Sequence, residues 1–268
     1  MNLFDSVILG IVEGITEFLP ISSTGHMILT SHLLKINGAV VDSFEVFIQL
    51  GAILAVVFLY RHRFACLFDF KSQRGFSGIR GLTLLAVTSL PILILGKLLE
   101  HTIKSQLFNP ISVSWALALG GVVLLLSDRF KFNHTVASID EMSVKDAFRI
   151  GLCQCFALCP GVSRAASTII GGMANGLSRT VAAEYSFLAA VPIMVIVCIK
   201  DLVDIWDQLS ANDIAVFAVG FIVAFISALF AVKSFIQLLQ RSSLGPFGIY
   251  RIIVAIAFFA LMNNHTLS

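Results

Sequence analysis

The chain has 268 residues, of which 57% are hydrophobic and 13% are charged, with a mean hydropathy of +0.93 and a formal net charge of +2. Soluble domains carry about 45–50% apolar and about 25% charged residues, so this composition excludes a water-soluble fold. The small net charge and the absence of a basic run exclude nucleic acid as a partner. The sequence therefore predicts an all-α integral membrane protein whose surroundings are membrane lipids.

Eight apolar regions follow one another along the chain. Six of them approach the roughly 20 residues that a helix needs to cross a bilayer. These predicted spans lie near 43–60, 82–99, 112–127, 180–199, 213–233 and 246–263. The other two regions, 1–36 and 144–178, are interrupted by Pro20 and by Pro160-Gly161. Each half is too short to cross alone, so we expect two re-entrant helical hairpins.

Lysine and arginine alternate between the connecting segments. Segments 61–81 and 128–149 are basic, whereas segment 200–212 is acidic. Because basic loops stay on the cytoplasmic side, this pattern places those two segments inside and both chain termini outside.

The two halves of the chain resemble each other in form. GIVEGITEFLPISSTGH (10–26) parallels GLCQCFALCPGVSRAA (151–166), and FEVFIQLGAI (44–53) parallels AEYSFLAAVP (183–192). Three spans separate the two hairpins, so the second copy is expected upside down relative to the first. The sequence thus predicts one membrane domain over 1–268, with inverted repeats at about 1–127 and 144–263. Such repeats place a binding site near the midplane, where the broken helices meet.

Two carboxylates lie in the first broken region. Glu13 and Glu17 are four residues apart and therefore share one face of a helix. At membrane depth, either one is protonated or both meet a cation, for which Mg²⁺ or Ca²⁺ is the natural choice. The alternative is a wet helix end at the surface.

Hydroxyl groups and a histidine follow the break at Pro20. Ser22, Ser23 and Thr24 are placed to cap a new helix, whose free N–H groups form an anion site. His26 comes three residues after Ser23, so the two side chains share a face and form a nucleophile with a proton-transfer partner. Plain helix capping and a structural histidine are the alternatives.

The second broken region contains an arginine. Ser163 is placed to cap the helix that follows Pro160, and Arg164 adds a positive charge there, with Thr168 four residues later. Arginine beside free backbone N–H groups is suited to phosphate oxygens. The alternative is an ion pair between Arg164 and a carboxylate such as Glu184. Arg251, near the start of the last span, is expected to reach toward the membrane interface.

The motifs EGITEFLPISSTGH and PGVSRAAST resemble the two signatures of the undecaprenyl pyrophosphate phosphatase family, also called bacitracin-resistance proteins. The resemblance extends over nearly the whole chain. It implies a bacterial inner-membrane enzyme that removes the terminal phosphate from undecaprenyl pyrophosphate, with a divalent cation and a site open to the outer side. This reaction regenerates the lipid carrier of cell-wall synthesis.

The resemblance also assigns roles to individual residues. The implied catalytic residues are Glu13, Glu17, Ser23, His26 and Arg164, and the implied phosphate-binding residues are Ser22, Thr24, Ser163, Arg164 and Thr168. Glu13 and Glu17 are the implied metal ligands. The family usually has Ser-Gly after the arginine, whereas this chain has Ala165-Ala166, which removes a hydroxyl.

Three classes of function remain to be distinguished. Inverted repeats and midplane carboxylates are as typical of a lipid-phosphate flippase or an ion-coupled transporter as of an enzyme. Serine, histidine and arginine in the same site favour an enzyme, because transport alone does not need them. A purely structural membrane subunit explains none of these polar motifs. The sequence leaves open the oligomeric state, the metal, and whether Ser23 or His26 is the nucleophile.

Overall fold

A computed structural model describes residues 1–71, 74–205 and 211–263, and the described residues are mostly helical. The α-helices are α1 (Leu3–Thr16), α2 (Ser23–Leu34), α3 (Ala39–Leu59), α4 (Arg61–Cys66), α5 (Gly78–Thr102), α6 (Pro110–Ser127), α7 (Val144–Gln154), α8 (Arg164–Ala174), α9 (Arg179–Ile205), α10 (Ala211–Leu239) and α11 (Gly245–Asn263). Within the described part there is no β-strand, only an isolated bridge between Val136 and Leu177. The predicted all-α class is confirmed.

Six of the helices are long and apolar enough to cross a membrane. They cover 39–59, 78–102, 110–127, 179–203, 213–239 and 245–262. Each overlaps a predicted span, and the largest change is at α10, which continues to Leu239 rather than ending at 233. The predicted set of six spans is therefore confirmed. Part of the acidic segment 200–212 lies outside the described residues.

The two remaining apolar regions each form a pair of short helices. In the first, α1 ends at Thr16 and α2 begins at Ser23. In the second, α7 ends at Gln154, a single turn of 3₁₀ helix covers Cys155–Leu158, and α8 begins at Arg164. The breaks fall where proline was expected to produce them. That these pairs re-enter the bilayer stays a prediction.

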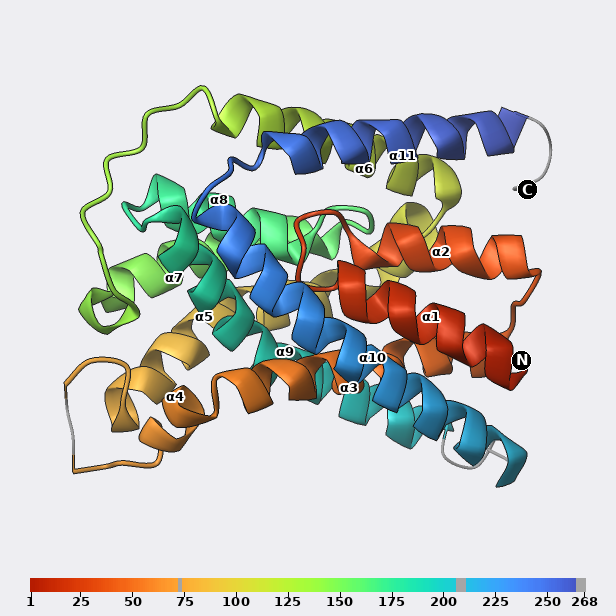
Figure 1. The fold of residues 1–268 in the computed structure, drawn as a ribbon, viewed down its shortest axis with the longest axis horizontal. Coiled ribbons are helices and arrows are strands. Elements are labelled where there is room, and N and C mark those ends of the chain that lie inside the picture. Colours follow the sequence, from red (N-terminus) through yellow and green to blue (C-terminus); the bar gives the residue numbers. More distant parts are fainter. Residues whose placement is uncertain (72–73, 206–210, 264–268) are drawn as a thin grey trace.

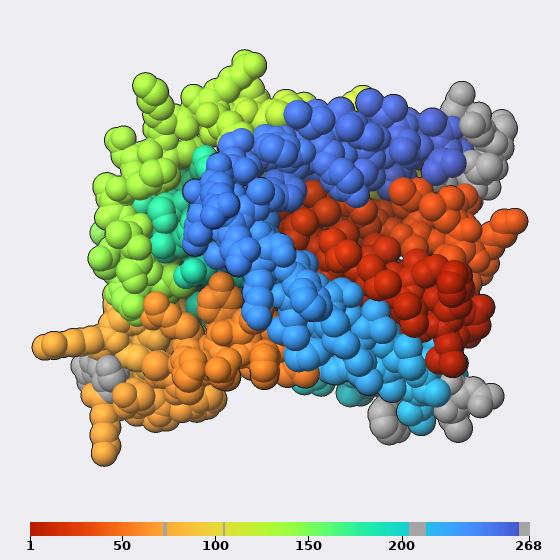
Figure 2. All heavy atoms as spheres, viewed as in Figure 1, coloured from red at the N-terminus to blue at the C-terminus, as the bar shows by residue number. Residues whose placement is uncertain are grey.

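The short helices pack against long ones in a matching way. Helix α1 lies along α10 and α7 lies along α5, while α6 pairs with α11 and α3 packs on α9 and α10 (Figure 1). Figure 2 shows α10 running diagonally across one face of the molecule beside α1. In the proposed repeat, α7 corresponds to α1 and α5 corresponds to α10. The α7–α5 pair is therefore the counterpart of the α1–α10 pair. This pairing agrees with the proposed internal repeat, whose inverted sense stays a prediction.

Glycine lets the short helices approach their partners closely. A Cβ atom on Gly14 of α1 would lie 2.4 Å from the carbonyl oxygen of Ala224 in α10. A Cβ atom on Gly151 of α7 would lie 2.7 Å from the carbonyl oxygen of Thr88 in α5. Small residues at helix contacts are the common way in which membrane helices pack backbone to backbone. Close packing of this kind fixes where each short helix ends, and therefore where the following turn begins.

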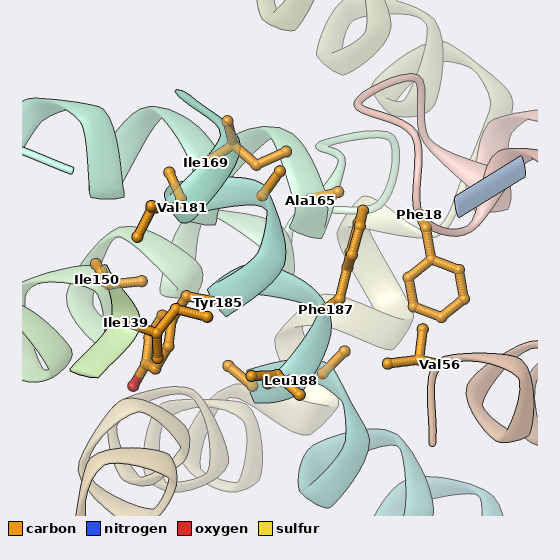
Figure 3. Close-up of a cluster of buried hydrophobic side chains, with 14 of the residues drawn as sticks. Phe18, Val56, Ile139, Ile150, Ala165, Ile169, Val181, Tyr185, Phe187 and Leu188 are labelled. Carbon is orange, nitrogen blue, oxygen red and sulfur yellow. The ribbon is translucent and has the colours of Figure 1, made fainter. Parts of the chain in front are cut away.

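A large cluster of buried apolar side chains fixes the first turn against the second half of the chain. Phe18 and Phe187 meet edge to face, with ring centroids 5.4 Å apart. Figure 3 shows Phe18 on its turn next to Phe187 and Val56, while Ala165 and Ile169 of α8 border the same cluster. Aromatic pairs of this geometry add about 0.5–1.5 kcal/mol beyond the area they bury. The core therefore holds the turn after α1 beside the start of α8.

One end of the molecule carries the start of α1 and the end of α11, and the other carries the described parts of the basic segments 61–81 and 128–149 (Figure 1). Asp140 joins these two segments, because Arg63 donates to both of its carboxylate oxygens at 2.8 Å and the Phe76 N–H donates at 2.7 Å. Partial burial by itself raises the pKa of Asp140, but these hydrogen bonds outweigh it and lower the pKa below the ordinary value. The basic end is thus held together by a carboxylate that stays charged.

Candidate functional site

Residues from both broken regions meet at Glu17. The Ser23 hydroxyl donates to Glu17 Oε2 at 2.5 Å, and Arg164 Nη2 donates to Glu17 Oε1 at 3.0 Å. All three side chains are mostly withdrawn from solvent, and Glu17 and Arg164 form a buried ion pair. Charge-assisted hydrogen bonds of this kind are short and strong in a low-dielectric environment. A serine, a carboxylate and an arginine are thereby joined in one chain of contacts.

These side chains line a small polar cavity of about 170 Å³ between the two broken regions. Its lining residues are Glu17, Ser22, Ser23, Thr24, Gln49, Ala157, Val162, Ser163, Arg164 and Met194. Six of the predicted site residues are therefore brought together. Gln49 was not predicted, although an amide within the apolar run 46–57 is a signal that could have found it.

Two helices begin at this cavity, and serine caps both. The Ser22 hydroxyl accepts from the Gly25 N–H at the start of α2, and the Ser163 hydroxyl accepts from the Ala166 N–H at the start of α8. Ser22 adopts φ 71°, a left-handed conformation that is unfavourable for a residue other than glycine. Strained residues of this kind concentrate at functional sites. Two helix N-termini pointing at one cavity form a binding site for an anion.

Arg164 is also held in place by groups other than Glu17. Arg164 Nη1 donates to the carbonyl oxygen of Ser186 at 3.2 Å, and its guanidinium carbon lies 5.8 Å from the centre of the Phe18 ring. Thr168 does not line the cavity. Its hydroxyl bonds instead with Ser186 Oγ, and it donates to the backbone carbonyl of Arg164. Thr168 thus contacts the support of the arginine, and the ion pair of Arg164 is with Glu17 rather than Glu184.

Glu13 lies one helical turn before Glu17 and is completely buried, with 0% of its surface exposed. Neither of its carboxylate oxygens has a hydrogen-bond partner among the described residues. A buried, unpaired carboxylate is costly unless it is protonated or binds a cation. Among the described residues, no group of three or more His, Cys, Asp or Glu side chains forms a metal site. Two carboxylates completed by phosphate oxygens do fit the way Mg²⁺ is usually held.

The histidine is directed away from Ser23. His26 Nδ1 is 2.8 Å from the carbonyl oxygen of Ser22, and His26 Nε2 is 2.8 Å from the Tyr250 hydroxyl. The two rings are almost parallel, with centroids 5.5 Å apart. The described cavity does not include His26 in its lining. Tyr250 lies 224 residues away in sequence, and no local pattern pointed to it.

The expectation for Arg251 is wrong. Its side chain is completely buried rather than extended to the interface, and its guanidinium donates to four backbone carbonyls. These are the carbonyls of Pro20 at 3.2 Å, Gly161 at 2.9 Å, Ala116 at 3.0 Å and Leu117 at 3.3 Å. The first two belong to the two broken regions, one to each. Arg251 therefore joins the two turns that carry the site.

A serine hydrogen-bonded to a carboxylate and facing an arginine is suited to attack on a phosphoryl group. Two helix N-termini at the same cavity favour an anionic substrate. Because this arrangement lies among six potential membrane spans, the fold and site define a membrane-embedded phosphohydrolase.

Comparison with known proteins identifies the family to which the chain belongs. Residues 6–257 match the family described as "Bacitracin resistance protein BacA", and the chain belongs to this family. The "Undecaprenyl-diphosphatase" of Maridesulfovibrio salexigens is 52% identical over 254 residues, which is 95% of this chain and 96% of the relative. The protein of that name from Solidesulfovibrio magneticus is 51% identical with the same coverage. The predicted family is confirmed, and the transporter alternative is not favoured.

Proposed function

We propose that this chain hydrolyses undecaprenyl pyrophosphate to undecaprenyl phosphate and inorganic phosphate. The reaction recycles the lipid carrier of cell-wall synthesis and contributes to bacitracin resistance. The single observation that carries the proposal is the position of Glu17, whose two carboxylate oxygens bind Ser23 and Arg164. Family membership over residues 6–257 supports the same reaction.

Ser23 is the nucleophile in this proposal. Its Oγ forms a bond to the terminal phosphorus while Glu17 accepts the hydroxyl proton. The bond from that phosphorus to the bridging oxygen breaks, and undecaprenyl phosphate leaves with the electron pair. Glu17 gives the proton to the departing phosphate and is a carboxylate again. Water then attacks the phosphorus of the phosphoserine while Glu17 accepts one of its protons. The bond from phosphorus to Oγ breaks, and Glu17 returns the proton to Oγ as inorganic phosphate leaves. The 2.5 Å hydrogen bond supports this assignment because the proton acceptor is already aligned.

Charge that develops on the phosphoryl group is stabilised by Arg164 and by the two helix N-termini. The guanidinium is oriented by Glu17 and by the carbonyl of Ser186, so it does not have to reorganise during the reaction. Thr24 and the capping residues Ser22 and Ser163 line the same cavity and are placed to contact phosphate oxygens. Phosphoryl transfer depends mainly on positioning and charge stabilisation of this kind.

Glu13 and Glu17 are the residues that would hold a divalent cation, Mg²⁺ or Ca²⁺. The unpartnered oxygens of Glu13 support this role. When bound, such a cation neutralises negative charge on the diphosphate. Glu13 would supply a carboxylate that has no other partner among the described residues, and Glu17 would supply the second.

His26 is proposed to hold the turn before α2 rather than to attack. Both ring nitrogens lie within hydrogen-bond distance of other groups, namely the Ser22 carbonyl and the Tyr250 hydroxyl. The opposite assignment, with His26 as the nucleophile, predicts a phosphohistidine. Acid-stable phosphate trapped on Ser23 supports the serine mechanism, whereas acid-labile phosphate on His26 contradicts it.

The proposed setting is the bacterial inner membrane, with the site opening to the outer side. The described parts of the basic segments 61–81 and 128–149 gather at one end of the molecule, and the start of α1 and the end of α11 lie at the other (Figure 1). The positive-inside rule assigns the basic end to the cytoplasm. A cysteine introduced near either end and labelled from one side of a vesicle tests this orientation.

Phosphate release by the purified chain in detergent is the direct test of the proposed function. Detergent leaves no second compartment, so transport cannot produce the signal. Arg164→Ala and Glu17→Ala are each expected to lower kcat by at least about 100-fold, the usual cost of removing one transition-state contact. Arg149→Ala serves as the control, because Arg149 is exposed on α7 and, within the described part of the chain, its side chain bonds only to Asn175, at 3.4 Å. Full phosphate release by the Arg164 or Glu17 variant contradicts the proposal.

A further inference from the structure

A large apolar groove lies between α6 and the second broken region. Its volume is about 650 Å³. Its lining residues are Leu107, Ile111, Ser112, Trp115, Ala116, Leu119, Gly120, Val123, Cys153, Phe156, Cys159, Val162, Ala166, Ser167, Ile170, Gly171, Ala174 and Arg251. We call this the α6–α8 groove.

The surface of the groove offers little to a polar ligand. Arg251 is its one charged lining residue, and the guanidinium is already bonded to four backbone carbonyls. The Ser167 hydroxyl is also engaged, because it donates to the carbonyl of Ser163 at 3.1 Å. Aliphatic and aromatic side chains form most of the remaining wall. The groove is therefore suited to a hydrocarbon.

The groove begins where the catalytic cavity ends. Val162 lines both, the next two residues, Ser163 and Arg164, line the polar cavity, and Ala166 and Ser167 line the groove. The first two turns of α8 thus present phosphate-binding groups on one side and apolar groups on the other. A molecule with a diphosphate head in the cavity could place its first carbon atoms directly into the groove.

We infer that the α6–α8 groove binds the prenyl tail of the substrate, with the first isoprene units beside Ala166 and the following ones running along α8 toward Ala174 and Val123. This inference rests on the proposed function, because that function requires a substrate with a diphosphate head and a long apolar tail. The groove adds the path that the tail takes.

A second apolar groove exists but does not reach the catalytic cavity. It has a volume of about 430 Å³ and is lined by Ile15 and Leu19 together with side chains of α10 and Phe247. Ile15 comes two residues before Glu17, so on a helix it points to the opposite face. This groove shares no lining residue with the polar cavity.

The groove is expected to fix the direction in which the prenyl tail leaves the cavity more than to increase the affinity for the substrate. Lipid tails are as apolar as the protein, so moving a prenyl tail from the bilayer into the groove gains packing but little hydrophobic free energy. In-line displacement at phosphorus requires the bridging oxygen to lie opposite the attacking Ser23, and a tail fixed along α8 would restrict where that oxygen lies. The groove is therefore expected to affect substrates according to their length.

The helix geometry of α6 gives a scale for that length. Ala116 lies at the level of the second turn, because a Cβ atom on Gly161 would be 2.9 Å from the Ala116 Cβ. Val123 is seven residues further along α6, which is about 10 Å at 1.5 Å per residue. A fifteen-carbon prenyl tail is long enough to reach Val123, whereas a five-carbon tail is not.

Two tryptophan variants of α6 test the inference in detergent. Val123 lines the groove and is 49% exposed, while its neighbour Val122 is 43% exposed and does not line it. Val123→Trp should raise KM for a fifteen-carbon prenyl diphosphate about five-fold, which corresponds to about 1 kcal/mol, and leave the five-carbon diphosphate unchanged. Val122→Trp should change neither. Equal KM values for Val123→Trp and the unaltered chain on the longer substrate overturn the inference.

A second measurement uses the unaltered chain and does not depend on a variant folding. A fifteen-carbon diphosphate with a benzophenone at its tail end is photolysed with the protein, and the linked peptides are identified by mass spectrometry. Links within 107–123 or 153–174 support the inference, and links within 227–247 place the tail in the second groove and overturn it. Failure of the proposed function is distinguishable, because it abolishes phosphate release from both tail lengths while the cross-links still report where the tail lies.

Discussion

Replacing Arg251 tests whether the relative position of the two turns affects catalysis when the catalytic side chains themselves are unchanged. Arg251 contacts no reacting group, yet its guanidinium donates to Pro20 O in the first turn and to Gly161 O in the second. In Arg251→Met, a side chain of comparable length fills the space without these donors. The turns that carry Ser23 and Arg164 then lose the group that holds them at a fixed separation.

Arg251→Met has two opposing effects on the stability of the fold. The carbonyls of Ala116 and Leu117 also accept hydrogen bonds within α6, so only the two turn carbonyls lose a required donor. Each buried, unsatisfied carbonyl costs about 1–3 kcal/mol, or about 2–6 kcal/mol for the pair. Removing the buried guanidinium recovers several kcal/mol of desolvation free energy. These quantities are similar in size, so we expect only a small change in the thermal unfolding temperature.

The effect on catalysis has no such compensation. A displacement of about 1 Å between reacting groups can cost on the order of 100-fold in rate. We therefore expect Arg251→Met to lower kcat about 100-fold, measured as phosphate release in detergent, while the protein still unfolds at nearly its normal temperature. Arg251→Lys, which keeps the charge but cannot reach all four carbonyls, should fall between. Arg241→Met is the control, because Arg241 is exposed beyond α10.

A kcat for Arg251→Met within three-fold of the unaltered chain would refute this reasoning. So would a variant that loses its fold entirely, because the compensation between hydrogen bonding and desolvation would then be wrong. The two failures are told apart by the unfolding temperature.

Three further predictions concern stability and the histidine. Because its pKa is lowered in the folded chain, Asp140 stabilises the fold above the ordinary aspartate pKa of about 4, and this contribution is lost as the pH falls through the lowered value. Asp140→Asn should therefore lower the unfolding temperature at pH 7. The difference should start to shrink as the pH falls below about 4 and should vanish only below the lowered pKa of Asp140. Gly14→Ala should destabilise the chain by about 1–3 kcal/mol, because the new methyl group would lie 2.4 Å from a carbonyl of α10. Gly96→Ala is its control, since that methyl group would meet only a flexible side-chain atom at 3.2 Å. Tyr250→Phe, which removes the hydroxyl at the histidine ring, should reduce kcat without introducing any phosphohistidine; unchanged kcat would contradict a positioning role for that ring.

Hydropathy and local chemistry were enough to predict much of the molecule. The six spans follow from the length of apolar runs, which depends on bilayer thickness and not on packing. The breaks at Pro20 and Pro160-Gly161 follow from the chemistry of proline and glycine. The meeting of Ser23 and Glu17 with Arg164 was expected from the proposed repeat, which places the two broken regions together.

The wrong expectation for Arg251 and the unpredicted partner of His26 both involve contacts between residues far apart in sequence. Arg251 looked like a residue that reaches the interface, because its position near the start of a span is local information. Its four carbonyl partners lie 90 to 231 residues away. His26 and Ser23 share a helix, but the nearest partner of the imidazole Nε2 is on α11. No spacing rule anticipates which distant helix a polar side chain will meet.

The position of Arg251 also has a consequence for biogenesis. The residue that joins the two turns belongs to α11, which leaves the ribosome after the helices that carry both turns. A chain inserted only as far as α10 already contains Ser23, Glu17 and Arg164 but lacks the group that holds their turns together. A nascent or truncated chain without α11 is therefore expected to be inert toward the lipid carrier, and activity begins only when α11 has been inserted.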